Sequence, residues 1–419
     1  MSNQVSKSLG CFPIQTVLPV ELLAEILAYV TRRTDICAAM LASRQFYSIL
    51  QPYLYKNVEL VSYIGDIRLA GFTRALDGPC TIYKSRAQQV EGLSLTLEKP
   101  PTNSAGNPAS MTNVYLPIYK LLLKLPNLSR LKLKMNRGLT PYAFWRDSQA
   151  YDTRWPWDIM EPDLNEDFQL PITTLIFDVS QWAGECPTNV FRDWLLTQDA
   201  VEHFEHVIDS RPCKLLPTSF PNLRFLKVAA SNLQFLVNDL VGPRPISHLS
   251  IVGQINGVSD LEAFRLPDAY NNVTSLSCTS DGSSSSYLVL AGYFRNVEAL
   301  NVSYQSDTTQ GYCGLASFLR DLRSHHRART FDKLRCLRVT RVFASQEGSY
   351  ARCPCSGVVA DVFGELIKLQ CLDVVAGSGE SIRFDRDGIQ WPVRRRCEES
   401  DMWRHDWEKD ALLDRLIIR

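Results

Sequence analysis

LPNLSRLKL, residues 125–133, carries the pattern that decides the fold. Its last apolar residues, Leu131 and Leu133, alternate with polar ones, which is the period of a β-strand with one buried face. The same layout returns in FPNLRFLKV from Phe220, FRNVEALNV from Phe294 and FDKLRCLRV from Phe331. A phrase that is used again at three further places in one chain predicts a repeated structural unit.

The core of this phrase, LxxLxL with other apolar residues allowed, occurs nine times. The matches begin at Val90, Leu128, Ile172, Leu223, Ile246, Val273, Val297, Leu334 and Leu369. Successive starts are 23 to 51 residues apart, so only the three shortest spacings fall in the range typical of leucine-rich repeats. Two interpretations stay open: an irregular repeat array, or an ordinary α/β domain whose parallel strands share the pattern.

Apolar residues at helical spacing fill the intervals between these matches. The predicted helical stretches are residues 115–125, 188–198, 233–240, 314–322 and 357–369. Strands that alternate with helices favour a parallel sheet. We therefore expect an α/β fold in which short N-terminal helices precede an irregular repeat solenoid with a parallel sheet.

The segment LPVELLAEILAYV, residues 18–30, predicts an amphipathic helix, with Leu22, Leu23, Ile26, Leu27 and Val30 on one face. Two further short helices are expected before Pro52, where the helical pattern should stop. A unit of about forty residues rarely buries all the apolar side chains it carries. These helices therefore either cover the end of the repeat core or offer an apolar surface to another protein.

Residues 18 to about 55 resemble an F-box. The resemblance rests on Leu18, Pro19, Glu21, Leu22, Ile26, Leu27, Asp35, Ile36, Leu41, Ser43, Arg44 and an aromatic residue at Phe46, where many members carry Trp. The following stretch, residues 51–60, is similar to the one after the F-box in many fungal F-box proteins. The repeats resemble the leucine-rich-repeat domain of such proteins, although the family's Asn or Cys position fits only at Asn136.

This resemblance implies that the F-box helices dock onto a Skp-type adaptor, which links them to a cullin within an SCF ubiquitin ligase. The chain would then be the substrate-recognition subunit, and its repeats would bind the target protein. The implied adaptor-binding residues are Leu18, Pro19, Leu22, Leu23, Ile26, Leu27, Ile36, Met40, Leu41 and Phe46. The alternative function is an interaction scaffold without a role in ubiquitin transfer.

The expected domain organisation has four parts. Residues 1–16 form a flexible tail, 17–57 the F-box, 58–395 the leucine-rich-repeat-like domain and 396–419 a C-terminal capping helix. The repeat domain carries insertions at about 97–114 and 136–170. The second insertion contains Trp145, Trp155 and Trp157, and either packs over the repeats or presents aromatic anchors to a partner.

Polar side chains that alternate with the buried leucines should form the other face of the sheet. The expected substrate-binding residues are Arg130, Lys132, Lys134, Lys227 and Arg338, set against Asp178 and Asp373. A surface that leans basic favours an acidic or phosphorylated segment of a target protein. A charged face that is merely solvated is the alternative interpretation.

Composition excludes several classes of function. The 45 basic and 45 acidic residues give no net charge that would attract nucleic acid or an anionic membrane, and no apolar run reaches the roughly 20 residues of a membrane span. The 12 cysteines lack zinc-finger spacing and predict free thiols in the cytoplasm or nucleus. HFEH at 203–206 is interpreted as two surface histidines on a helix. We expect no enzyme, cofactor or metal site.

Overall fold

The structure of the chain is a computed structural model. The described residues are 19–30, 32–63, 67–77, 86–98, 115–135, 169–179, 197–207, 219–229, 244–253, 272–280, 294–306, 319, 323, 331–343, 356–375, 381–386 and 390–393. Several predictions lie outside them: the tail 1–16, nearly all of both insertions, and the capping helix 396–419.

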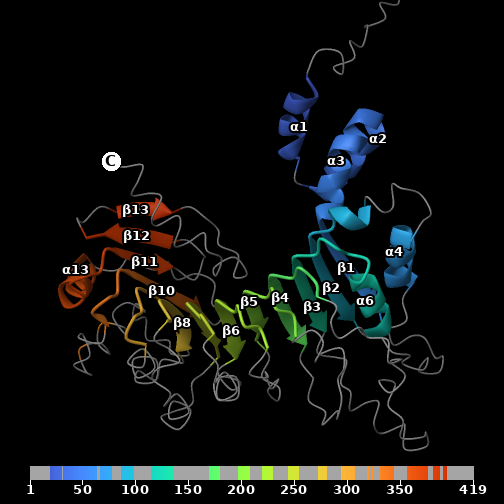
Figure 1. Cartoon of the computed structure of the whole chain (residues 1–419). Coiled ribbons are helices and arrows are strands. Elements are labelled where there is room, and N and C mark those ends of the chain that lie inside the picture. The colour runs from blue at the N-terminus through green and yellow to red at the C-terminus, as the bar shows by residue number, and fades with distance from the viewer. Residues whose placement is uncertain are drawn as a thin grey trace, which may run out of the picture.

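The described residues form one sheet of thirteen strands, whose order in space is their order in the chain (Figure 1). From β1 to β11, each strand runs parallel to the next. The bounds are β1 Asn57–Tyr63, β2 Gly92–Glu98, β3 Arg130–Met135, β4 Thr174–Val179, β5 His203–His206, β6 Phe225–Ala229, β7 His248–Val252, β8 Ser275–Ser280, β9 Ala299–Ser306, β10 Cys336–Phe343, β11 Cys371–Val375, β12 Ser381–Asp385 and β13 Gln390–Val393. An open sheet in which each strand lies beside its predecessor is what a solenoid produces.

All nine strands predicted from LxxLxL are confirmed, and the expectation of a parallel sheet needs one correction. Strands β12 and β13 run antiparallel to their neighbours, so the sheet ends in antiparallel pairs. Strand β5 replaces the helix expected at HFEH. Its residues follow the repeat pattern through Val201 and Phe204, but the last apolar position is taken by His206, which is buried and stacks on the Phe204 ring.

Each repeat phrase places four side chains in one continuous core. In the phrase that begins at Phe220 these are Phe220, Leu223, Leu226 and Val228, all buried. The amide of Leu223 donates a hydrogen bond of 3.1 Å to the carbonyl of Phe220, which closes the turn before the strand. Equivalent bonds of 2.9 to 3.3 Å join Leu125 to Leu128, Phe294 to Val297, Phe331 to Leu334 and Leu366 to Leu369. The phrase is therefore a recurring structural unit.

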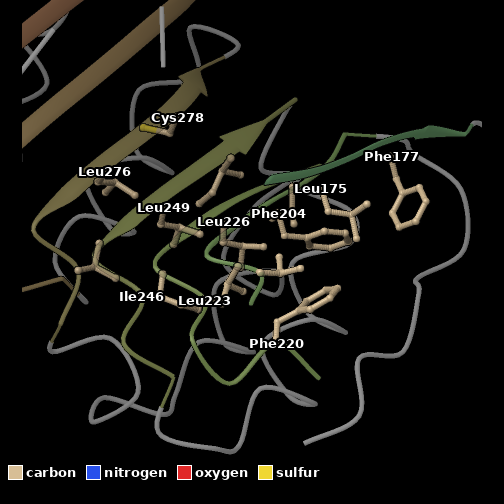
Figure 2. Close-up of a cluster of buried hydrophobic side chains, with 14 of the residues drawn as sticks. Leu175, Phe177, Phe204, Phe220, Leu223, Leu226, Ile246, Leu249, Leu276 and Cys278 are labelled. Carbon is tan, nitrogen blue, oxygen red and sulfur yellow. The ribbon is translucent and has the colours of Figure 1, made fainter. Parts of the chain in front are cut away.

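Aromatic side chains fill part of this core in the middle of the sheet (Figure 2). The Phe204 ring lies 5.0 Å from the Phe220 ring and 6.0 Å from the Phe177 ring, measured between centroids. Phe204 is fully buried. It comes from the strand that the sequence pattern misses, so the core depends on a unit that the leucine pattern does not reveal.

The helices whose bounds lie within the described residues are α1 Val20–Ala28, α2 Arg33–Ala42, α3 Arg44–Lys56, α4 Ile67–Asp77, α6 Tyr115–Leu122 and α13 Ser356–Glu365. Helices α6 and α13 confirm two of the helical predictions and lie along the outer side of the curved sheet (Figure 1). The stretches 188–198, 233–240 and 314–322 lie almost wholly outside the described residues.

The first three helices form a small core of their own. Leu23, Leu27, Ile36 and Leu50 are its buried residues, and they are separate from the core of the sheet. The prediction that Pro52 ends the third helix is wrong, because α3 continues to Lys56. Leu54, beyond the proline, packs against this core and helps to hold the last turn in place.

Candidate functional site

Helix α1 carries two neighbouring apolar stripes that have different surroundings. Leu23 and Leu27 are four positions apart and both are buried in the core of the three helices. Leu22 and Ile26, also four apart, are 46% and 54% exposed. Residues four apart lie on the same side of a helix. One stripe therefore holds the helix in place, while the other is accessible.

Both stripes were predicted to bind the adaptor, but in the structure only the stripe of Leu22 and Ile26 is accessible. Of the remaining predicted adaptor-binding residues, Ile36 is buried, Met40 and Phe46 pack against the helical core, and Pro19 is exposed. Leu41 at the end of α2 is 89% exposed. Leu18 lies outside the described residues.

Further exposed apolar side chains lie on these helices and were not predicted as contacts. They are Val20 and Tyr29 at the ends of α1, and Tyr47 and Tyr53 on α3. Tyr29 follows Ile26 by three positions and so extends the accessible stripe of α1. A strict helical count that separated positions 22, 26 and 29 from 23, 27 and 30 would have found this second stripe.

The three helices join the sheet without a linker, since α3 ends at Lys56 and β1 begins at Asn57. The Asn57 carbonyl accepts a hydrogen bond from Arg33, and its side-chain oxygen accepts one of 2.9 Å from Arg130 on β3. The second bond passes over β2 at Gly92, which pairs with both Asn57 and Arg130.

Gly92 has no side chain, and that absence leaves room for this bond. A Cβ atom at position 92 would lie 2.5 Å from the Asn57 side-chain oxygen, closer than real contacts allow. The glycine, the asparagine and the arginine therefore brace the first three strands at the point where the helices attach.

The second candidate surface is the sheet face that points away from the core, here called the non-core face. Strand register places one row of side chains across it, from β1 to β12. The row consists of Glu59, Ser94, Lys132, Ile176, Glu205, Lys227, Ser250, Ser277, Asn301, Arg338, Asp373 and Arg383.

Accessibility changes along this row. Glu59 and Lys132 near the helices are exposed, whereas every member from Ser250 to Arg383 is buried. Of the predicted substrate-binding residues, Arg130, Lys132 and Lys134 lie together on β3, with Arg130 and Lys132 exposed. Lys227 and Arg338 lie on β6 and β10, away from β3. The accessible part of the face is its N-terminal end.

Lys227 belongs to a partly buried charged cluster. Its ammonium group lies 3.3 Å from the Glu205 carboxylate, whose other oxygen lies 2.8 Å from the His203 ring. Burial alone would raise the pKa of the Glu205 carboxyl, but the hydrogen bond with His203 and the charge of Lys227 outweigh it, so the pKa is lowered. His203 also stacks on the Phe225 ring at 4.0 Å. The cluster joins the neighbouring strands β5 and β6 by side-chain contacts.

Arg338 is held in a buried ion-pair network. The Asp373 carboxylate accepts a hydrogen bond of 3.1 Å from Arg338 and bonds of 2.8 and 3.1 Å from Arg383. All three side chains are at most 10% exposed. This network joins β10, β11 and β12, including the first antiparallel pair of the sheet.

Within the described part of the chain, no group of three or more His, Cys, Asp and Glu side chains has the arrangement of a metal site. The described helices are also too short or too polar to cross a bilayer. His203 and His206 point to opposite faces of β5, as their three-residue separation on a strand requires.

Comparison with known proteins identifies one part of the chain. Residues 16–60 match the model of the F-box-like family, a range that contains all three helices of the separate small core and the start of β1. No curated protein is similar enough to the chain to be identified as a relative.

Proposed function

We propose that this protein is the substrate-recognition subunit of an SCF-type ubiquitin ligase. F-box domains generally bind Skp-type adaptors, and the adaptor in turn would connect the chain to a cullin. The observation that carries the proposal is the accessible apolar stripe of Leu22 and Ile26 on an F-box helix whose other stripe is already buried. In this role the chain performs no chemistry itself, and it raises the local concentration of a target beside the other subunits.

The magnitudes indicate that α1 cannot supply the whole interface. Full burial of an aliphatic side chain contributes about 1.5–3 kcal/mol, and Leu22 and Ile26 are already half shielded. Association costs roughly 4–15 kcal/mol. Additional contacts are therefore needed, and Leu41 on α2 is the most exposed apolar residue that can supply one.

Affinity purification of the full chain from cells tests the proposal. The wild-type chain should bring both a Skp-type adaptor and a cullin with it, and the double variant Leu22→Asp, Ile26→Asp should bring neither. The matched control is Leu123→Asp, Ile367→Asp, which places the same charges on exposed apolar residues outside the F-box. Adaptor without cullin would favour an interaction scaffold, and the absence of both from the wild-type sample would refute the proposal.

The body of the chain is proposed to be a leucine-rich-repeat domain that binds the target on the accessible end of the non-core face. Arg130 and Lys132 project from β3 there, and no acidic residue occupies the neighbouring row positions Ser94 and Ile176. Closely spaced cations favour carboxylate or phosphate groups as partners. The proposed target segment is therefore acidic or phosphorylated, and it lies beside the F-box junction.

Charge reversal tests the proposed target surface. Lys132→Glu, Lys134→Glu should abolish capture of target proteins that accumulate under proteasome inhibition, while adaptor binding persists. Arg224→Glu, Arg295→Glu is the control, because both residues are exposed and precede their strands. It makes the same change in net charge away from the face. Equal capture by both variants would exclude the basic strand as the target surface. The expected locations of such a complex are the cytoplasm and the nucleus.

A further inference from the structure

Two cysteines lie side by side near the C-terminal end of the sheet. Cys336 begins β10 and Cys371 begins β11, and the parallel register pairs them directly. Neither forms a disulfide bond in this structure. Ala299 and Asp385 flank the pair on β9 and β12. The sequence alone predicted thiols at these positions and assigned neither cysteine a function.

The spacing of the pair suits a disulfide bond. Neighbouring strands are about 4.8 Å apart, which lies within the range of Cα separations that disulfides span. Side chains at paired register positions project from the same face of the sheet, so the two thiols lie on the same side. A disulfide formed by exchange with a small-molecule disulfide is reversed by an excess of reducing thiol.

The surroundings of the two thiols differ, and this difference makes Cys336 the one that reacts first. A side-chain hydrogen bond joins the two cysteines, and this contact, together with burial and the nearby Asp373 charge, raises the pKa of Cys371. Cys371 is also buried, and its thiol lies 4.0 Å from the Asp373 carboxylate. Cys336 is less buried. The thiolate is the reactive form of a cysteine, and the raised pKa of Cys371 disfavours it there. Cys336 is also the more accessible of the two, so it is the first to react with an oxidant in solution.

We propose that Cys336 and Cys371 are an oxidation site that forms a reversible intramolecular disulfide with a small-molecule disulfide such as oxidised glutathione. The Cys336 thiolate attacks one sulfur of glutathione disulfide and releases one glutathione thiolate. Cys371 then loses its proton to solvent and attacks the Cys336 sulfur of the mixed disulfide, which releases the second glutathione. The two protein thiols are oxidised, and one glutathione disulfide is reduced to two thiols.

The disulfide would change the hydrogen bonding of the buried ion-pair network that contains Asp373. The Cys371 thiol is a donor within reach of Asp373, and a disulfide sulfur has no proton to donate. The new bond would also tie β10 to β11 beside Arg338 and Asp373. The two cysteines lie at the opposite end of the sheet from the proposed adaptor-binding helices, so this proposal does not rest on adaptor binding.

Peptide mapping of the full-length wild-type chain tests the proposal. The reduced protein is incubated with glutathione buffers of increasing oxidised fraction, quenched with acid, alkylated under denaturing conditions and digested with trypsin. The peptide of residues 336–338 should appear linked to the peptide of residues 369–383, with the loss of two hydrogen atoms. Dithiothreitol should abolish the link.

One variant and one internal control make the result decisive. In Cys371→Ser, Cys336 should accumulate as the mixed disulfide with glutathione, because the second step cannot occur. In the wild-type chain, Cys278 serves as the internal control: burial raises its pKa to about 12, so it should be recovered fully alkylated after denaturation. Separate alkylation of Cys336 and Cys371 at every buffer ratio would overturn the proposal, as would linkage of either to another cysteine.

Discussion

The Arg86 guanidinium donates a hydrogen bond of 3.0 Å to the Tyr47 hydroxyl on the last F-box helix, and so joins residues 39 positions apart in the chain. The same guanidinium lies over the Tyr55 ring, 5.4 Å from its centroid. Arg86 comes just before β2, so it ties α3 to the second strand of the sheet. The F-box is therefore attached to the sheet by side chains as well as by the direct passage from α3 to β1.

Removal of this tie should loosen the F-box without unfolding the sheet. In Arg86→Ala, amide hydrogen exchange should rise in α3 and stay unchanged in β8 and β9, because only the former loses a contact. Arg74→Ala is the control, since within the described residues the Arg74 side chain bonds to a carbonyl of its own helix, α4. Equal exchange in α3 for both variants would show that Arg86 does not hold the F-box.

Replacement of Asp373 should destabilise the C-terminal end of the sheet. Asp373→Asn removes the buried carboxylate that the guanidinium groups of Arg338 and Arg383 share. Loss of one partner of a buried ion pair costs about 3–5 kcal/mol, so the thermal midpoint should fall clearly. Glu365→Gln removes a partly exposed partner of the exposed Arg323 and should leave the midpoint almost unchanged. Similar midpoints for the two variants would contradict this account.

Glu205 should make the stability of the sheet depend on pH. Its pKa is lowered in the folded protein from the ordinary value of 4.5, so the carboxylate stabilises the fold above that pH. The stabilisation is lost as the pH falls through the lower, folded value. At neutral pH Glu205→Gln should cost about 1–3 kcal/mol of unfolding free energy, because a charged hydrogen-bond acceptor is replaced by a neutral one.

Urea titrations of both proteins across the acidic range measure this dependence. The difference between wild type and Glu205→Gln should shrink at acidic pH. Glu202→Gln, at an exposed position just before β5, is the control and should match the wild type throughout. A difference that stays constant down to strongly acidic pH would exclude the carboxylate as its source.

Much of the fold could be predicted from the sequence because the leucine pattern records burial directly. Leu131 and Leu133 point into the core and Lys132 does not, as the strand period requires. The missed strand β5 has His206 where the pattern needs an aliphatic residue, and its ring is buried and stacks on Phe204 of the same strand. Antiparallel pairing of β12 leaves no trace in a periodicity that reports only which face is buried.

The candidate sites were harder to predict because exposure depends on neighbours. Leu22 and Leu23 are equally apolar, and only the packing of α2 and α3 decides that Leu23 is buried. Likewise Lys132 and Arg338 occupy the same row, but Asp373 and Arg383 meet Arg338 from strands far along the sequence. The charges of the row residues could therefore be predicted from the sequence, whereas the part of the row that is accessible became evident only from the fold.

The central claim is that the accessible stripe of α1 is an adaptor-binding surface, and the affinity of the purified chain for a purified Skp-type adaptor tests it most directly. Leu22→Asp, Ile26→Asp should raise the Kd about 100-fold or more, since two apolar contacts of about 1.5 kcal/mol each are replaced by charges. Leu123→Asp, Ile367→Asp should bind like the wild type. If the wild-type chain does not bind the adaptor, or the Leu22 and Ile26 variant binds with unchanged affinity, the claim is wrong.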